Sequence, residues 1–352
     1  MKHPPAYAAD LASCRAAIRS GSRSFYAASL LLPRRVREPA YALYAFCRLA
    51  DDAVDLSAGK MEALARLRER LDRAYRGAPH DDPADRAFAR MVERYDLPRA
   101  LPEALIEGLG WDAEGRRYET LSDLRAYSAR VAGAVGAMMT VLMGVRDAET
   151  LARACDLGVA MQLSNIARDV GEDAREGRLF LPLDWLRAEG IDPDAFLAEP
   201  RFTPELGHVV AALLLEAEQL YDRSASGIAG LPFGARPAIR AARILYREIG
   251  REVARRGFDS IGSRAIVPDR RKRRLVARAI GGLALPQAGR GAAPLPETAF
   301  LVDAAARAPR TTVVRPTVGD HIGRMAEILM KAHARRAAQG AASMRTAPMA
   351  GE

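Results

Sequence analysis

The sequence contains few cysteines, histidines and aromatic residues. Its 352 residues include 3 cysteines, 5 histidines and only 6% aromatic residues. Cys14, Cys47 and Cys155 lie far apart, with neither CxxC spacing nor the dense, even count of a secreted disulfide scaffold. No histidine and cysteine show the spacing of a zinc site. This composition fits a reducing compartment, and we expect a cytoplasmic protein.

Long hydrophobic runs are also missing. The longest nearly uncharged stretch, residues 131–145, lies between Arg130 and Arg146 and is shorter than the roughly 20 residues that a transmembrane helix needs. Asp10 stands where the apolar run of a signal peptide would precede Cys14. We therefore expect neither a signal peptide nor a transmembrane helix, and at most peripheral contact with the inner membrane.

Regularly spaced β-branched residues, the signal of an all-β chain, are sparse as well. Ala, Leu, Arg and Glu dominate the stretches between Gly and Pro breaks, and 49% of the residues are hydrophobic. The pattern predicts an all-α fold with helices at 11–20, 25–30, 38–54, 61–75, 83–95, 121–144, 149–173, 203–228, 235–256, 268–281 and 318–336. The Gly-, Ala- and Pro-rich residues 281–296 indicate a linker.

Basic residues outnumber acidic ones. The formal charge of +9 and the pI near 9.8 favour a polyanionic partner, such as a phosphorylated substrate, an anionic membrane surface or nucleic acid. In the densest basic run, residues 270–274, a solvated helix end is the first interpretation and docking on anionic lipid the second. No aromatic residues interleave with this run, so we expect no nucleic-acid partner.

Two predicted helices carry a polar face with two carboxylates one turn apart. A helix turns about 100° per residue, so each set of four side chains falls within an arc of roughly 60° or 80°. The first face holds Tyr44, Arg48, Asp51 and Asp55. The second holds Gln162, Asn165, Asp169 and Asp173, with Arg168 on its flank. The chain therefore contains two acidic helix faces of the same design.

Paired carboxylates in apolar helices require compensation. They repel each other by a few tenths of a kcal/mol in an isolated helix, and burial makes the charges costlier. Mg²⁺ would compensate them, because it takes oxygen ligands and is held by one or two carboxylates plus substrate phosphate oxygens. Either face alone is better explained as a solvated surface. Their joint occurrence in the most apolar helices favours a diphosphate clamped by metal ions.

Gly133 and Gly136 interrupt the apolar helix predicted at 121–144. Each costs the helix about 1 kcal/mol relative to Ala, so another interaction must offset it. Close helix packing and clearance for a substrate are equally good explanations at this stage.

These motifs resemble those of the squalene and phytoene synthases. The matching segments are Asp51-Asp52-Ala53-Val54-Asp55, Asn165-Ile166-Ala167-Arg168-Asp169-Val170-Gly171-Glu172-Asp173, Ser22-Arg23-Ser24-Phe25, residues 127–136 and Gly177-Arg178-Leu179-Phe180-Leu181-Pro182. The likeness covers residues 15 to 285. It implies a single-domain, all-α isoprenoid synthase bundle around a central apolar cavity. The expected organisation is an N-terminal segment (1–20), a catalytic domain (21–285), a linker with a helical extension (286–336) and a disordered tail (337–352).

The resemblance also assigns roles to residues. The implied metal ligands are Asp51, Asp55, Asn165, Asp169 and Asp173. Diphosphate and substrate contacts are implied for Ser22, Ser24, Phe25, Tyr44, Arg48, Arg168, Tyr246 and Arg264. Tyr127 and Gln162 would lie near the reacting carbons, with Tyr44 and Arg48 also catalytic, and the cavity wall would include Val131, Ala132, Val135 and Gly136.

The activity that the resemblance implies is head-to-head condensation of two geranylgeranyl diphosphates to phytoene, in carotenoid biosynthesis. Mg²⁺ is the expected cofactor, with Mn²⁺ as a substitute, and no NADPH is expected. Three alternatives stay open. A C30 synthase would use farnesyl diphosphate, and a non-catalytic relative would act in assembly. A head-to-tail prenyltransferase fits less well, because residues 169–173 lack a doubled aspartate.

Overall fold

The structure is a computed structural model that describes residues 5–55, 59–281 and 293–307, without the side chains of residues 5, 23, 51–55, 280 and 281. All of these residues belong to one structural unit, Met1–Thr311. The predicted helix at 318–336 and the predicted disordered tail lie outside the described residues.

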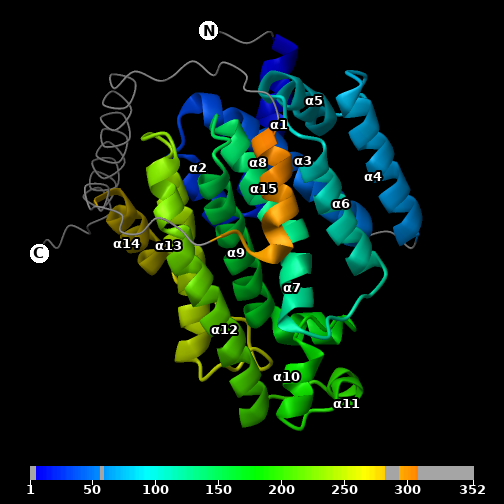
Figure 1. Ribbon diagram of the computed structural model, residues 1–352, viewed down its shortest axis with the longest axis vertical. Coiled ribbons are helices and arrows are strands. Elements are labelled where there is room, and N and C mark those ends of the chain that lie inside the picture. The colour runs from blue at the N-terminus through cyan, green and yellow to red at the C-terminus, as the bar shows by residue number, and fades with distance from the viewer. Residues whose placement is uncertain (1–4, 56–58, 282–292, 308–352) are drawn as a thin grey trace, which may run out of the picture. The chain divides into compact units, whose positions relative to one another are not determined.

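The described residues form helices and no strands, which confirms the all-α prediction (Figure 1). The α-helices are α1 (Pro5–Gly21), α2 (Arg23–Ser29), α3 (Arg34–Asp55), α4 (Lys60–Tyr75), α5 (Pro83–Tyr95), α6 (Ala100–Ala113), α7 (Leu121–Ser128), α8 (Ala134–Leu142), α9 (Ala148–Arg175), α10 (Leu183–Ala188), α11 (Pro193–Ala198), α12 (Pro204–Ser224), α13 (Arg236–Arg255), α14 (Asp269–Gly281) and α15 (Ala299–Arg307). A π-helical turn, η1 (Ala129–Gly133), joins α7 to α8, and the 3₁₀ turns are η2 (Ser226–Gly230) and η4 (Pro296–Thr298).

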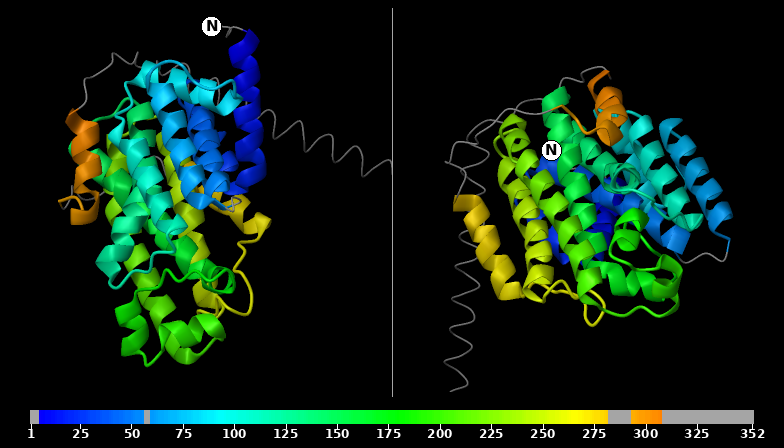
Figure 2. Two further views of the ribbon diagram at one scale, coloured as in Figure 1. Left: turned by 90° about the vertical axis from the view of Figure 1, so that its right-hand side faces the viewer. Right: turned by 60° about the horizontal axis from the view of Figure 1, so that its bottom comes forward.

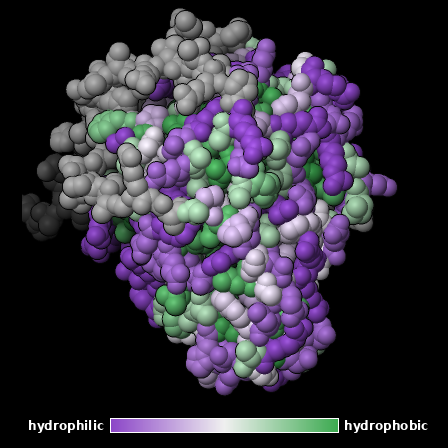
Figure 3. Space-filling view, in the orientation of Figure 1, coloured by the Kyte–Doolittle hydropathy of each residue, from purple (hydrophilic) through white to green (hydrophobic). Residues whose placement is uncertain are grey.

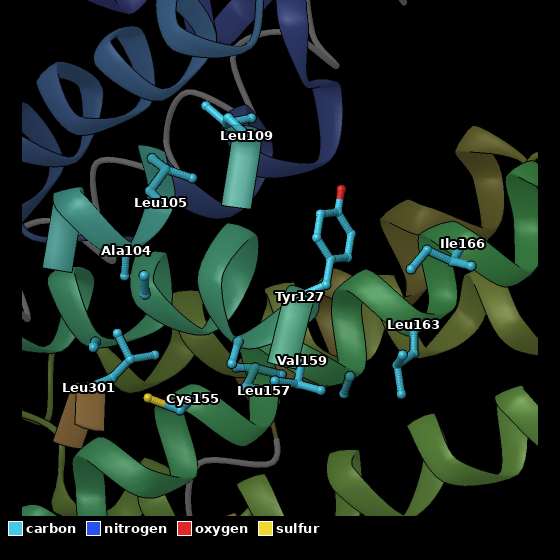
Figure 4. Close-up of a cluster of buried hydrophobic side chains, with 14 of the residues drawn as sticks. Ala104, Leu105, Leu109, Tyr127, Cys155, Leu157, Val159, Leu163, Ile166 and Leu301 are labelled. Atoms are coloured by element: carbon cyan, nitrogen blue, oxygen red, sulfur yellow. The ribbon is translucent and has the colours of Figure 1, made fainter. Parts of the chain in front are cut away.

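Helix α9 is the central element of the bundle. It packs against α8, α12, α13 and α15, and the views in Figures 1 and 2 show these helices side by side. Its buried residues belong to one apolar cluster with side chains of α6, α7 and α15, including Leu105, Leu109 and Leu301 (Figure 4). Because α9 is surrounded on most sides, its polar residues must face either another polar group or a cavity.

Local sequence signals explain where many helices begin. The Thr120 hydroxyl accepts from the Asp123 amide, and the Asp123 carboxylate accepts from the Thr120 amide, which is the predicted capping box. The Asp147 carboxylate caps α9 by accepting from the amide and the hydroxyl of Thr150. Helix α4 is amphipathic, and Figure 3 shows hydrophilic side chains along the edge where Figure 1 places it.

Some elements were not predicted. Helices α6, α10, α11 and α15 are additions to the predicted set, and α6 was hidden by Pro102, Gly108 and Gly110. A side chain at Gly108 would lie 2.7 Å from Val131, so glycine is needed there for close packing. No helix in the described part of the chain combines the length and apolar character needed to cross a membrane.

Candidate active site

A cavity of about 330 Å³ runs along one side of α9. Its walls come from α1, α2, α3, η1, α8, α9, α12, η2 and α13. The apolar lining includes Leu43, Cys47, Val131, Ala132, Val135, Gly136, Leu157, Met161, Ile239 and Ala242. All four residues predicted for the cavity wall are in this lining.

The cavity has an apolar end and a polar end. At the mainly apolar end, Leu32, Met143, Leu231 and Ala238 line the cavity and belong to one buried cluster. Thr150 and the buried Arg153 lie beside η2 and are the polar residues of this end. At the polar end, Tyr246 of α13 lies near Tyr44 of α3 and Arg168 of α9, and the positive charge of Arg168 acts to lower the pKa of Tyr246. Helices α3, α9 and α13 therefore all run from the apolar end towards the polar end.

Three aromatic rings line the polar end. The ring of Phe25 lies 4.9 Å from that of Tyr246 and 6.4 Å from that of Tyr44, measured between centroids. Gly21 makes room for this group, because a side chain there would overlap the Tyr44 hydroxyl. Burial raises the pKa of Tyr246, and hydrogen bonding to Ser22 opposes the increase. The structure thus brings four predicted substrate-binding residues together.

The polar face of α9 continues this end of the cavity. Gln162 and Asn165 line the cavity, and Asp169 and Asp173 follow one and two turns further along the helix. Both carboxylates are largely buried, with side chains 17% and 14% exposed.

Arginines hold both carboxylates. Arg168 donates from Nε to Asp169 Oδ1 at 2.7 Å, and Arg264 approaches the same oxygen at 2.9 Å. Arg178 donates to Asp173 Oδ1 at 3.1 Å. The acidic face is therefore partly neutralised by cations that are also suited to bind diphosphate oxygens.

Arg178 was not predicted as a site residue. It reaches Asp173 because α9 ends at a glycine, Gly177, with φ of 74°, and the Arg178 amide bonds back to the Asp173 carbonyl at 2.8 Å. A glycine followed by an arginine directly after an acidic helix face was the available signal.

The pKa of Asp173 is raised to about 6. Burial is the main cause, and it outweighs the opposing effect of Arg178, while the charge on Asp169 raises the pKa further. A carboxylate in this state gains stability when a cation binds beside it.

The loop after α13 positions Arg264. The Gly171 amide donates to the Ser260 carbonyl at 3.0 Å, the Ser260 hydroxyl donates to the Ala167 carbonyl at 2.6 Å, and Arg175 donates to the Ile261 carbonyl at 2.7 Å. A side chain at position 171 would lie 2.7 Å from that Ser260 oxygen. The glycine in the acidic motif is therefore needed to seat the loop.

We expect Gly171→Ala to destabilise the protein by about 1–3 kcal/mol, because the new methyl group meets backbone rather than a flexible side chain. The displaced loop should also weaken the contact between Arg264 and Asp169 and lower activity. Gly207→Ala is the matched control, since its added carbon would find only ordinary contacts, the nearest at 3.4 Å. Urea denaturation of both variants measures the difference, and equal midpoints would contradict the prediction.

Other predicted residues lie elsewhere. Tyr127 donates to Asp112 Oδ2 at 2.7 Å and packs in an aromatic cluster with Tyr118 and Phe180, at centroid distances of 5.1 and 5.4 Å. In Figure 4 its ring points away from Val159. It is not among the residues that line the cavity, so its place beside the reacting carbons stays a prediction.

Arg48 and Ser24 also lie outside the cavity lining. Arg48 is exposed, and Ser24 is half-buried in the first turn of α2. Their roles stay predictions.

Close packing explains Gly136, which lines the cavity, but not Gly133, which lies outside the lining. A side chain at Gly136 would overlap the Ala154 carbonyl of α9, whereas one at Gly133 would find ordinary contacts, the nearest at 3.5 Å. A side chain at Gly158 on α9 would likewise overlap the Ala132 carbonyl. The helices that carry the wall and the acidic face therefore approach at backbone contact distance.

The donor set fits a divalent cation that prefers oxygen ligands. Asp169 and Asp173 present carboxylates on one face of α9, and Asn165 adds an amide. Of the histidines and cysteines in the described segments, only Cys47 lines the cavity. Among the side chains that the structure describes, no three acidic, histidine or cysteine groups converge. The side chains of Asp51 and Asp55, in the last turns of α3, lie outside that set.

A solved structure shows the same architecture. The crystal structure of a dehydrosqualene synthase in complex with ligand matches 79% of this chain and 97% of that chain, with a TM-score of 0.74 at 32% identity. An all-α bundle whose apolar cavity ends at an acidic helix face defines an enzyme of the prenyltransferase type.

The chain belongs to the squalene/phytoene synthase family, which matches residues 18–278. It is 57% identical over 306 residues to the phytoene synthase of Rhodobacter capsulatus, covering 85% of this chain and 90% of that protein. It is also 43% identical over 257 residues to the 15-cis-phytoene synthase of a Paracoccus species, covering 70% and 83%. The family resemblance drawn from the acidic motifs is confirmed.

Proposed function

We propose that this chain is a phytoene synthase of carotenoid biosynthesis, with a catalytic domain at 21–285. It condenses two geranylgeranyl diphosphates head to head, through a cyclopropylcarbinyl diphosphate, to phytoene. One observation carries the proposal: a long apolar cavity ends at a buried carboxylate face flanked by arginines. The relatives named phytoene synthase support the C40 product over a C30 one.

The polar end is the proposed diphosphate site. When bound, Mg²⁺ stabilises the negative charge on the departing diphosphate as a Lewis acid. Asp51, Asp55, Asp169 and Asp173 would hold it with Asn165, and Mn²⁺ suits the same oxygen donors. Arg168 and Arg264 already lie against Asp169, so they can turn to diphosphate oxygens when a cation takes the carboxylate.

The cavity wall protects the allylic carbocation. Water would quench such a cation, and the lining offers aliphatic side chains and the faces of Phe25, Tyr44 and Tyr246 instead. Gln162 is one of few polar groups along the wall, and we assign it and Tyr127 to the region of the reacting carbons.

The atoms balance without a reductant. Condensation forms the cyclopropane ring with loss of one diphosphate and one proton. The second ionisation and rearrangement release the other diphosphate, and loss of another proton forms the central double bond. No hydride is needed, so we propose no NADPH.

Purified protein incubated with labelled geranylgeranyl diphosphate and Mg²⁺ is expected to release diphosphate and to form a C40 hydrocarbon, as measured by chromatography. A chelator should stop both, and Mn²⁺ should restore them at least in part. A C30 hydrocarbon formed only from farnesyl diphosphate would assign the chain to the C30 synthases. Absence of diphosphate release with either substrate would favour a non-catalytic assembly protein.

We also propose a cytoplasmic protein in peripheral contact with an anionic membrane surface and without a nucleic-acid partner. The net charge of +9 supports attraction to anionic lipid, and the hydrocarbon product is soluble only in a bilayer.

A further inference from the structure

Two turns of the chain form the apolar end of the cavity, away from the aspartates. Leu32 lies in the turn between α2 and α3, and Leu231 lies between η2 and α13. Both line the cavity, and both pack in one cluster with Met143. We call these turns, residues 30–33 and 231–235, the two end turns.

A large hydrophobic side chain faces solvent on each end turn. Leu30 is 37% exposed and Phe233 is 60% exposed, whereas Leu32 and Leu231 are 3% and 5% exposed. At each turn the chain passes from the outer surface to the cavity lining within two residues. At these two turns the wall of the cavity is therefore one chain segment thick.

Hydrogen bonds to backbone carbonyls hold the end turns in place. The amides of Leu31 and Leu32 donate to the carbonyls of Ala28 and Ser29 at 3.0 Å each. Arg236 donates from Nε to the Leu231 carbonyl at 2.8 Å. Ordered turns therefore hold the exposed side chains outward. The exposure of this apolar surface to water is unfavourable in free energy.

Basic residues follow the exposed side chains closely in the sequence. Segments 30–40 and 231–241 contain five arginines, Arg34, Arg35, Arg37, Arg236 and Arg240, and a single acidic residue, Glu38. The Arg34 side chain is 58% exposed, and Arg236 lies over the Phe233 ring. Apolar tips set among arginines fit the headgroup region of an anionic bilayer, where the tips reach acyl chains and the cations meet phosphates.

We propose that the end turns dock on an anionic phospholipid bilayer, with Leu30 and Phe233 inserted at the boundary of headgroups and acyl chains. The second half of the inference rests on the proposed function: the hydrocarbon leaves the cavity at this end, between Leu32 and Leu231, and enters the bilayer directly. Diphosphate leaves at the opposite, polar end. Such an arrangement spares an apolar product any passage through water.

Flotation with phospholipid vesicles tests the docking. The test variant combines Leu30→Asp with Phe233→Asp, and the control combines Phe202→Asp with Met61→Asp, whose parent residues are similarly exposed at 39% and 57%. Wild type and control should bind vesicles of phosphatidylcholine with phosphatidylglycerol, and the test variant should bind about tenfold or more weakly. Circular dichroism melting confirms that each variant is folded.

Three results would overturn the docking. The test variant and control could bind equally, or wild type could show no preference for anionic vesicles over pure phosphatidylcholine. Alternatively, a variant with Arg273→Glu and Arg274→Glu in the exposed basic face of α14 could lose binding while the test variant keeps it. A change of oligomeric state in the test variant, with vesicle binding intact, would assign the surface to a second copy of this chain.

Turnover tests the release step. Added anionic vesicles should raise the multiple-turnover rate of wild type severalfold and leave the single-turnover rate unchanged. The test variant should keep the single-turnover rate and lose the increase, because neither of its positions lines the cavity. An equal increase in the test variant would refute release at this end. Failure to form any hydrocarbon would refute the proposed function and leave the binding result intact.

Discussion

Replacing Asp173 with asparagine is expected to abolish turnover and to make the metal-free protein more stable. Turnover should fall on the order of a thousandfold, because a proposed metal ligand is lost and metal stabilisation of a leaving group contributes several kcal/mol. Diphosphate release measures this loss. Glu176→Gln removes the other carboxylate that pairs with Arg178, 61% exposed, and should keep normal turnover.

The stability gain follows from the raised pKa of Asp173. The unfolded chain titrates near 3.8 and the folded chain at about 6, so the folded state binds more protons between these values. The contribution of this group to stability is therefore full below pH 3.8 and is lost as the pH rises through about 6. Asparagine stays neutral, so the variant should be more stable at pH 7.5 by about 1–3 kcal/mol.

Melting curves with a chelator, recorded from pH 4 to pH 8, measure that gain. The advantage of the variant should grow with pH through about 6 and reach a few degrees. A variant with normal turnover would contradict the metal role, and one that unfolds more easily at pH 7.5 would contradict the electrostatic argument.

Replacing Asp156 with alanine is expected to cost about 3–5 kcal/mol of stability. Asp156 is fully buried, and its Oδ2 lies 3.2 Å from Nε of both Arg153 and Arg223. Burial raises its pKa, and the two arginines oppose the increase. The substitution removes a carboxylate that balances the charge of Arg153, itself 2% exposed, and breaking a buried pair in this way is strongly destabilising.

Urea denaturation measures the effect against Asp222→Ala. Asp222 also pairs with two arginines but is 67% exposed, so its removal should cost less than about 1 kcal/mol. Asp156→Asn preserves the shape of the side chain and should show a smaller loss than alanine, which keeps the test usable if the alanine variant does not fold. Similar midpoints for the alanine variants at positions 156 and 222 would contradict the prediction.

The sequence predicted the parts of the site that depend on local spacing. Asp169 and Asp173 share a face because they are one turn apart, whereas the wall residues Val131 and Val135 were implied by the family resemblance. The contact of Arg264 with Asp169 joins residues 95 positions apart and was not predicted, because the family resemblance implied only a diphosphate contact for Arg264. Such contacts depend on how a loop is seated, and helical periodicity carries no information about that.

Other features of the site depend on contacts that helix propensities do not predict. Tyr127 donates a hydrogen bond to Asp112 of α6. The glycines and the proline of α6 kept this helix from being predicted, so the partner of Tyr127 could not be predicted either. Arg153 lies in the cavity lining although arginine is rarely buried. Its ion pair with Asp156 compensates the buried charge, and this pair lies towards the opposite end of α9 from the acidic motif. Charge compensation between helices is set by packing.

The parallel course of α3 and α9 has an electrostatic consequence. Asp55 is the last residue of α3, and Asp173 lies in the last turn of α9, so the acidic motifs sit at the C-terminal ends of both helices. The peptide dipoles add partial negative charge at such ends. Both the carboxylates and the backbone dipoles therefore disfavour the binding of an anion at these helix ends. Binding of a diphosphate group should therefore follow the arrival of cations rather than precede it.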